Sequence, residues 1–128
     1  MDFDTKSVYT RWSNSDVLES GAMAGAFFET FFISEILKSY YNTGTLNPPL
    51  YYYRDKDSKV IDLLIEQNGT LYPVEIKKTT TPRKDFLKHF KVLDNIKGMK
   101  KGTGGIVCLY DDLVKIDQNN WVIPMNDL

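Results

Sequence analysis

Cysteine and histidine are nearly absent from this chain, which has one of each among 128 residues. A disulfide framework needs pairs of cysteines, and a structural zinc site needs about four Cys or His ligands. The sequence therefore excludes both, and the single thiol favours a reducing compartment. The same counts weaken hydrolases that depend on a Cys/His or Ser/His/Asp arrangement.

Long hydrophobic runs are also missing, and no apolar stretch approaches the ~20 residues of a membrane span. The first residues, MDFDTKS, lack the basic and apolar regions of an export signal. We therefore expect a soluble, cytoplasmic protein with no membrane partner.

A phosphate-binding loop of the Walker type is absent as well. Residues 101–105 (KGTGG) lack the Gly-Lys-Ser/Thr ending and lead into a predicted strand instead of a helix. We therefore expect no ATPase activity from this chain alone.

Positive charge is scarce in most of the sequence but concentrated in one segment. Residues 77–101 carry nine Lys or Arg against two acids, whereas the net charge of the whole chain is -1. Such asymmetry favours a polyanion as partner, although a solvated, Lys-rich helix face would look the same. The residues that we expect to contact nucleic acid are Lys78, Arg83, Lys84, Lys88 and Lys91.

The 42% of hydrophobic residues suffice for the core of one domain, and no repeat or low-complexity tract divides the chain. Periodicity and turn residues predict alternating helices and strands, followed by short strands. The predicted helices are 22–41 and 83–97, and the predicted strands are 51–54, 59–66, 70–78, 105–110, 113–116 and 121–124. The order is therefore α-β-β-β-α-β, which is typical of an α/β domain with a mixed central sheet flanked by helices.

The first predicted helix is apolar nearly all round and includes one acidic residue within its apolar stripe. On a helical projection Glu29 lies between Phe32 and Ile33, which predicts that it points inward. Phe27 and Phe31 lie on another side and need cover of their own. We therefore expect this aromatic face to offer a contact for a second copy of the chain.

The dipeptide Asn68-Gly69 predicts a two-residue hairpin turn between two strands. A turn of that length pairs Gln67 with Thr70, and the same register places Asp62 opposite Glu75. Two carboxylates directly opposite each other are destabilising, and Lys77 on the same face cannot easily neutralise both. A divalent cation could, and oxygen ligands suit Mg²⁺ or Mn²⁺.

Two interpretations of these polar residues remain open at this point. In one, Asp62, Glu75 and Glu29 hold the cation and Lys77 acts on a phosphate nearby, which would suit phosphodiester hydrolysis. In the other, Lys77 forms a salt bridge with the two strand acids, and Glu29 is protonated or paired with a lysine.

Three segments resemble a known family: residues 25–29 (GAFFE), 53–62 (YRDKDSKVID) and 72–78 (YPVEIKK). They resemble the C-terminal domain of unknown function that many bacterial and archaeal AAA+-type ATP-binding proteins carry. That domain is similar in fold to the PD-(D/E)XK, or restriction-endonuclease-like, proteins. The resemblance implies a nuclease-like domain over residues 20–128, with residues 1–19 as the arm that follows a missing ATPase region.

The same resemblance implies a role for each polar residue of the site. Glu29 is the helix carboxylate, Asp62 is the first strand carboxylate, and Glu75 with Lys77 is the acid-x-Lys element. It also implies Mg²⁺ or Mn²⁺ as cofactor, DNA as substrate and the ATPase domain as partner. The competing expectation is a non-catalytic module that retains the fold and binds DNA or protein.

Overall fold

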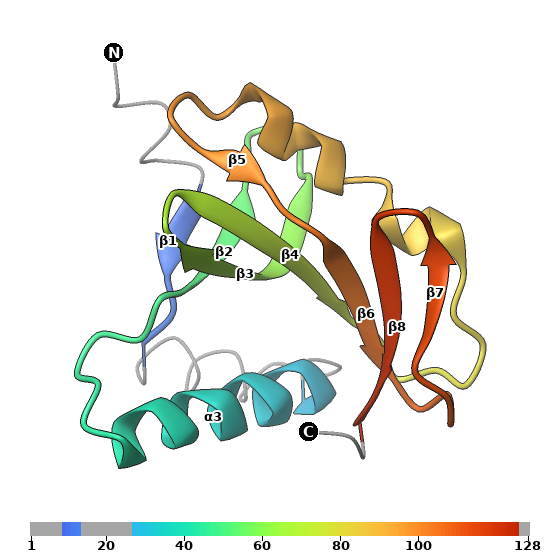
Figure 1. Ribbon diagram of the computed structural model, residues 1–128, viewed down its shortest axis with the longest axis horizontal. Coiled ribbons are helices and arrows are strands. Elements are labelled where there is room, and N and C mark those ends of the chain that lie inside the picture. Colours follow the sequence, from blue (N-terminus) through green and yellow to red (C-terminus); the bar gives the residue numbers. More distant parts are fainter. Residues whose placement is uncertain (1–8, 14–26, 126–128) are drawn as a thin grey trace.

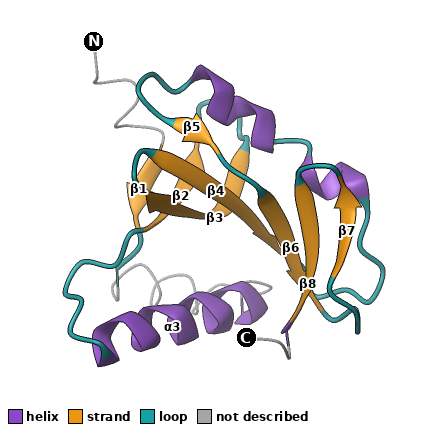
Figure 2. Cartoon of the chain, viewed as in Figure 1, coloured by secondary structure: helices purple, strands orange, loops and turns teal. Residues whose placement is uncertain are grey.

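The computed structural model describes residues 9–13 and 27–125, which form one long helix, two short 3-10 helices and an eight-stranded sheet (Figures 1 and 2). The predicted arm at residues 1–19 lies largely outside the described residues. The elements are β1 (Tyr9–Arg11), α3 (Phe27–Asn42), β2 (Leu50–Arg54), β3 (Val60–Gln67), β4 (Thr70–Ile76), the 3-10 helices η1 (Lys84–Leu87) and η2 (Phe90–Asn95), β5 (Lys100–Lys101), β6 (Gly104–Cys108), β7 (Val114–Asp117) and β8 (Asn120–Pro124).

The sheet is mixed, as the sequence predicted. Its strand order is β1-β2-β3-β4-β6-β8-β7, and β5 pairs with β4 beside that path. Strands β1 to β4 pair antiparallel, β4, β6 and β8 run parallel, and β7 returns antiparallel to β8. The chain is therefore a mixed α/β domain in which β4 has an antiparallel partner on one side and a parallel partner on the other.

The predicted hairpin register between β3 and β4 is confirmed for five residue pairs, but the predicted pair of Asp62 and Glu75 is not among them. Gln67 pairs with Thr70, and the pairing continues without a bulge to Leu63 and Val74. The turn residues Asn68 and Gly69 have φ angles of 54° and 81°, the left-handed values that a tight hairpin turn of this kind requires and that Asn and Gly adopt at low cost.

Two apolar clusters cover the two faces of the sheet. Helix α3 packs its fully buried Ile33 and Leu37 against one face, and η1 and η2 cover the other with Leu87, Phe90 and Leu93. Neighbouring residues of one strand divide between the clusters, as Ile106 and Val107 do in β6. This alternation explains why β6 reads as a continuous apolar run, because both of its faces are buried.

Two sequence predictions need correction. The basic segment 83–97 does not form one α-helix but the two 3-10 helices η1 and η2. Apart from Val92, its buried apolar residues recur at every third position (Leu87, Phe90, Leu93, Ile96), which matches the three residues per turn of a 3-10 helix. In addition, residues 9–11 form the edge strand β1, where the sequence predicted only a connecting arm.

The first predicted helix is confirmed from Phe27 onward, while residues 22–26 lie outside the described part. In residues 9–13 and 27–125 no helix is long and apolar enough to cross a membrane.

Candidate functional site

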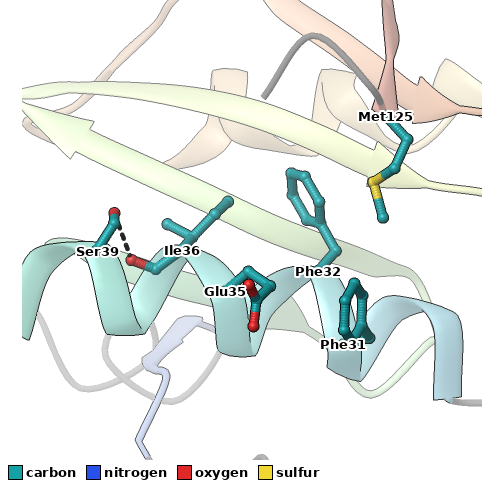
Figure 3. Close-up of a pocket in the computed structure, with 6 residues that line it drawn as sticks. All are labelled: Phe31, Phe32, Glu35, Ile36, Ser39 and Met125. Carbon is teal, nitrogen blue, oxygen red and sulfur yellow. Dashed lines mark hydrogen bonds between the residues drawn. The ribbon is translucent and has the colours of Figure 1, made fainter.

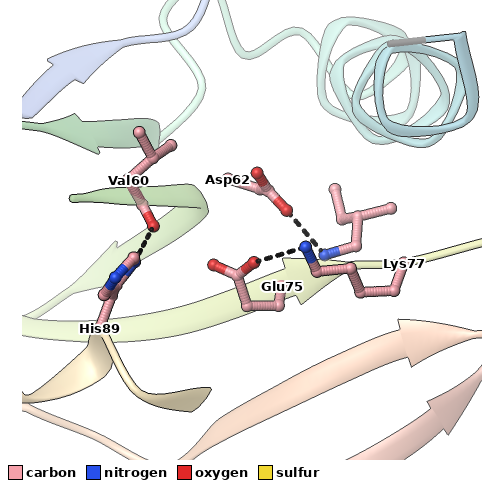
Figure 4. A network of polar contacts seen from close by, with 6 residues as sticks. Val60, Asp62, Glu75, Lys77 and His89 are labelled. Carbon is pink, nitrogen blue, oxygen red and sulfur yellow. Dashed lines mark hydrogen bonds and ion pairs between the residues drawn. The ribbon is translucent and has the colours of Figure 1, made fainter. Parts of the chain in front are cut away.

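The carboxylate of Asp62 takes the place of a strand partner where β3 and β4 stop pairing. The backbone ladder ends at Leu63 and Val74, and beyond it the N–H of Ile76 donates to Asp62 Oδ2 at 2.9 Å (Figure 4). Burial raises the pKa of Asp62, and the hydrogen bond from Ile76 opposes that rise. Asp62 is therefore fixed in position and partly stabilised as an anion.

Glu75 lies in the same network with far less support. Its side chain is only 8% exposed, and no described residue forms a hydrogen bond with its Oε1 atom. Burial, and then the neighbouring Asp62 carboxylate, raise the pKa of Glu75 to about 9. Lys77 lowers it, but its Nζ lies 3.9 Å from Glu75 Oε2, the outer limit of an ion pair. Glu75 therefore holds a proton at neutral pH unless another cation replaces it.

Lys77 follows directly after β4 and touches a ring that the sequence did not single out as part of a site. Its Nζ lies 5.5 Å from the centre of the Phe86 ring, and Arg83 Cζ lies 4.7 Å from the same centre. The acid-x-Lys pattern could find Lys77, but the approach of Phe86 depends on how η1 packs and leaves no local signal in the sequence.

Glu29 approaches the site from the first turn of α3. Burial raises its pKa to about 7, with a further contribution from the charge of Asp62 and an opposing one from Lys77. Glu29 is thus close enough for the charges of Asp62 and Lys77 to change its pKa. Within the described residues, however, no three His, Cys, Asp or Glu side chains gather closely enough to hold a metal ion, so Glu29 does not complete a three-carboxylate cluster with Asp62 and Glu75.

Comparison with known proteins identifies the domain that carries these residues. The family described as Domain of unknown function (DUF4143) matches residues 24–128. The chain belongs to the DUF4143 family. No curated protein and no solved structure matches the chain itself. This finding confirms the sequence prediction of a domain of unknown function.

All four candidate site residues lie within the DUF4143 match, and so do the five cations predicted to contact nucleic acid. Lys78, Arg83, Lys84, Lys88 and Lys91 are all exposed. Arg83 pairs with Asp85 at 3.2 Å, and the charge of Lys84 is felt by Asp117 of β7. The cations therefore follow η1 and η2, beginning directly beside Lys77.

His89 has a structural role in this DUF4143 chain. Its Nδ1 lies 3.3 Å from the carbonyl oxygen of Val60 and so ties the turn between η1 and η2 to the start of β3 (Figure 4). This contact holds the basic segment against the strand that carries Asp62.

A separate hollow of about 460 Å³ lies along α3 and contains none of the four site residues (Figure 3). Its lining includes Phe31, which is half exposed, and Met125 after β8. It shares Phe31 with the aromatic face that the sequence predicted as a contact between copies.

Proposed function

We propose that this chain is a Mg²⁺-dependent nuclease-like domain that acts on DNA phosphodiesters. The observation that carries the proposal is the buried pair of carboxylates at the end of the β3–β4 ladder, in which Glu75 Oε1 has no hydrogen-bond partner among the described residues. Burying two neighbouring carboxylates is costly. A proton on Glu75 lowers that cost, and a cation between the two carboxylates could take the place of the proton.

The donor set suits a magnesium ion. Mg²⁺ keeps several waters and often takes only one or two carboxylates from a protein. Asp62 and Glu75 would hold it, and Glu29 would add negative charge from the start of α3. When bound, such a cation supplies Lewis-acid stabilisation to the phosphoryl group and activates water for attack.

The residues of this chain have distinct tasks in the proposed reaction. Asp62 is held by the Ile76 N–H and so fixes the position of the negative charge that would bind the cation. Glu75 must give up the proton that it holds at neutral pH before it can act as a ligand. Lys77, whose side chain is 40% exposed, can turn its ammonium toward a phosphate oxygen and stabilise negative charge there.

The order of elements supports a restriction-endonuclease-like fold. Helix α3, the three antiparallel strands β2 to β4 and the parallel strand β6 follow each other as the resemblance implies, with η1 and η2 in place of the second helix. By the same resemblance, we propose that the domain belongs to the C-terminal part of an AAA+-type ATP-binding protein.

Calorimetric titration with Mg²⁺ tests the proposal. Wild-type protein should bind the ion and release about one proton per cation at pH 7, which titrations in buffers of different ionisation enthalpy would measure. Asp62→Ala should abolish binding, whereas Asp57→Ala, in the exposed turn between β2 and β3, should not. Cleavage of plasmid and oligonucleotide DNA in Mg²⁺ or Mn²⁺ is the second readout.

A non-catalytic binding module is the alternative, and the contact between Lys77 and Glu75 favours it. In that case the polar residues form a salt bridge and the cations of η1 and η2 dock DNA or another domain. Absence of Mg²⁺ binding, or Mg²⁺ binding without cleavage of any single- or double-stranded DNA or RNA, would replace the nuclease proposal by this one.

A further inference from the structure

Phe86 lies close to two cations of different origin. Lys77 follows the sheet strand β4, whereas Arg83 precedes η1, yet both approach the same aromatic ring at 5.5 and 4.7 Å from its centre. Both distances are within the range in which a cation is attracted by the face of an aromatic ring. The ring is therefore a common support for two positive charges.

The support is fixed in place by the core. Phe86 is partly buried and packs against the cluster formed by η1, η2 and the sheet, which includes Leu87 and Phe90. A ring anchored in this way loses little further freedom when the cations settle on it. The positions of Lys77 and Arg83 therefore depend on the packing of η1.

The charges around the two cations are only partly compensated. Arg83 uses its Nε toward Asp85, and both of these side chains are about 60% exposed. Within the described part of the chain, the two terminal nitrogens of Arg83 make no hydrogen bond. Among the same residues, Lys77 has only the distant Glu75 oxygen as an ion-pair partner. An anion that reached both cations would gain two charge-assisted hydrogen bonds.

We propose that Lys77 and Arg83 together bind one phosphate group of a nucleic-acid backbone, and that Phe86 is the positioning residue that holds the two cations for it. The proposal deepens the proposed function and rests on it, because it assigns the substrate phosphate to a place beside Asp62 and Glu75.

The test counts phosphates through the salt dependence of binding. Binding of the whole chain to a fluorescein-labelled 20-base-pair DNA duplex in EDTA would be measured by anisotropy at several salt concentrations. The slope of log K against log salt changes by about 0.9 for each phosphate that the protein no longer neutralises. If the two cations share one phosphate, the double variant Lys77→Ala/Arg83→Ala should lose about 0.9 units of slope. A loss of about 1.8 units would mean two separate phosphates and would overturn the proposal, as would no loss.

Phe86 is tested by replacing its ring and then restoring it. Phe86→Leu keeps an apolar side chain in the core but removes the aromatic face, and should weaken binding about five-fold. Phe86→Tyr keeps the face and should bind as wild type does. Equal affinity of Phe86→Leu and wild type, or equal loss in both variants, would overturn the positioning role. Lys38→Ala on α3 is the control, and thermal melting verifies that each variant is folded.

Failure of this inference and failure of the proposed function are separable. The binding experiments contain no metal and measure no cleavage. Suppose that the slope decreases as expected in the double variant, that Phe86→Tyr binds as wild type does, and that no DNA is cleaved in Mg²⁺. This result would overturn the nuclease reaction and leave the phosphate site. Cleavage together with unchanged slopes in the double variant would do the reverse.

Discussion

Asp62 and Glu75 are neighbouring carboxylates whose different partners give them different charge states. Asp62 accepts the Ile76 N–H, which favours its anion, whereas Glu75 Oε1 has no donor within the described residues. The proton that the pair shares therefore belongs on Glu75. A proton on this residue makes the stability of the metal-free protein depend on pH.

We predict that Glu75→Gln flattens that dependence. The pKa of Glu75 is raised to about 9 from the ordinary value of 4.5, so the folded state keeps a proton that the unfolded chain has lost. The stability gained in this way is complete below about pH 4.5 and declines as pH rises toward about 9. Urea unfolding in EDTA measures this dependence. Between pH 6 and pH 8 the free energy of unfolding of wild type should fall by up to about 1.4 kcal/mol per pH unit relative to that of Glu75→Gln.

The matched control for this experiment is Glu35→Gln, on the exposed side of α3. Glu35 is 53% exposed and pairs with Lys38, so its removal should leave the pH dependence of wild type unchanged. A difference in the free energy of unfolding between Glu75→Gln and wild type that stays constant from pH 6 to pH 8 would contradict the prediction.

Asp62→Asn separates a cation site from a simple salt bridge. It removes a buried negative charge but keeps an oxygen that can accept the Ile76 N–H, so it should stabilise the metal-free protein. Mg²⁺ at a hundredfold excess over Kd should stabilise wild type by about 2.7 kcal/mol and the variant not at all. Thermal melting with and without Mg²⁺ measures both effects. Destabilisation by Asp62→Asn together with no effect of Mg²⁺ on wild type would favour the salt bridge.

The β3–β4 hairpin shows how far local signals predict a site. Asn68-Gly69 selects a two-residue turn, and the turn fixes the register as far as Leu63 and Val74, the pair directly before Asp62 and Glu75. Each step depends on neighbours in the sequence, so the closeness of the two acids could be predicted, whereas the end of the ladder just before them could not. The approach of Phe86 to Lys77 crosses from one element to another and could not.

The basic segment shows where such signals fail. A three-residue spacing of buried side chains suits a 3-10 helix, but an α-helix tolerates the same pattern over two or three turns. The edge strand β1 was missed for a related reason: three residues are too few to show a period. Its strand conformation depends on pairing with β2, where Tyr9 lies opposite Tyr53.

We predict that reversing two charges on this segment weakens DNA binding irrespective of sequence. Lys84 and Lys88 are exposed, so Lys84→Glu/Lys88→Glu should lower the salt slope by about 0.9 units for each phosphate that is no longer neutralised. The stability cost should be about 0.5 kcal/mol per residue. Anisotropy measures the slope and urea unfolding the stability. Lys38→Glu, on α3, is the control, and an unchanged slope in the double variant would leave these lysines as a solvated surface.

The strand order of the sheet depends on long-range contacts that no turn encodes. β6 joins the antiparallel strands β1 to β4 to the pair β8 and β7, and it does so through close backbone contacts at its first residues. A Cβ atom on Gly104 would lie 2.7 Å from Phe90 Cε2 and 2.9 Å from the carbonyl oxygen of Pro73. This glycine is therefore required by the packing of η2 and β4 on β6.

Gly104→Ala should destabilise the whole domain by about 1–3 kcal/mol, because a backbone atom has to move to admit the methyl group. Urea unfolding measures the loss. Thr103→Ala, at the exposed neighbouring position, should change stability by less than about 0.5 kcal/mol. Similar stabilities for the two variants would show that β6 and its neighbours can shift without cost.

The hydrogen bond from Ile76 to Asp62 also gives the site its own spectroscopic reporter. A backbone N–H that donates to a carboxylate resonates downfield of one that donates to a neutral acid, and the acceptor of Ile76 is the Asp62 carboxylate. Its peak in a ¹⁵N-correlated NMR spectrum should therefore move when Asp62 gains a proton or when a cation draws on its charge. Titration of Mg²⁺ into labelled protein would follow occupancy of the site at this one amide, without a substrate and before any reaction is known.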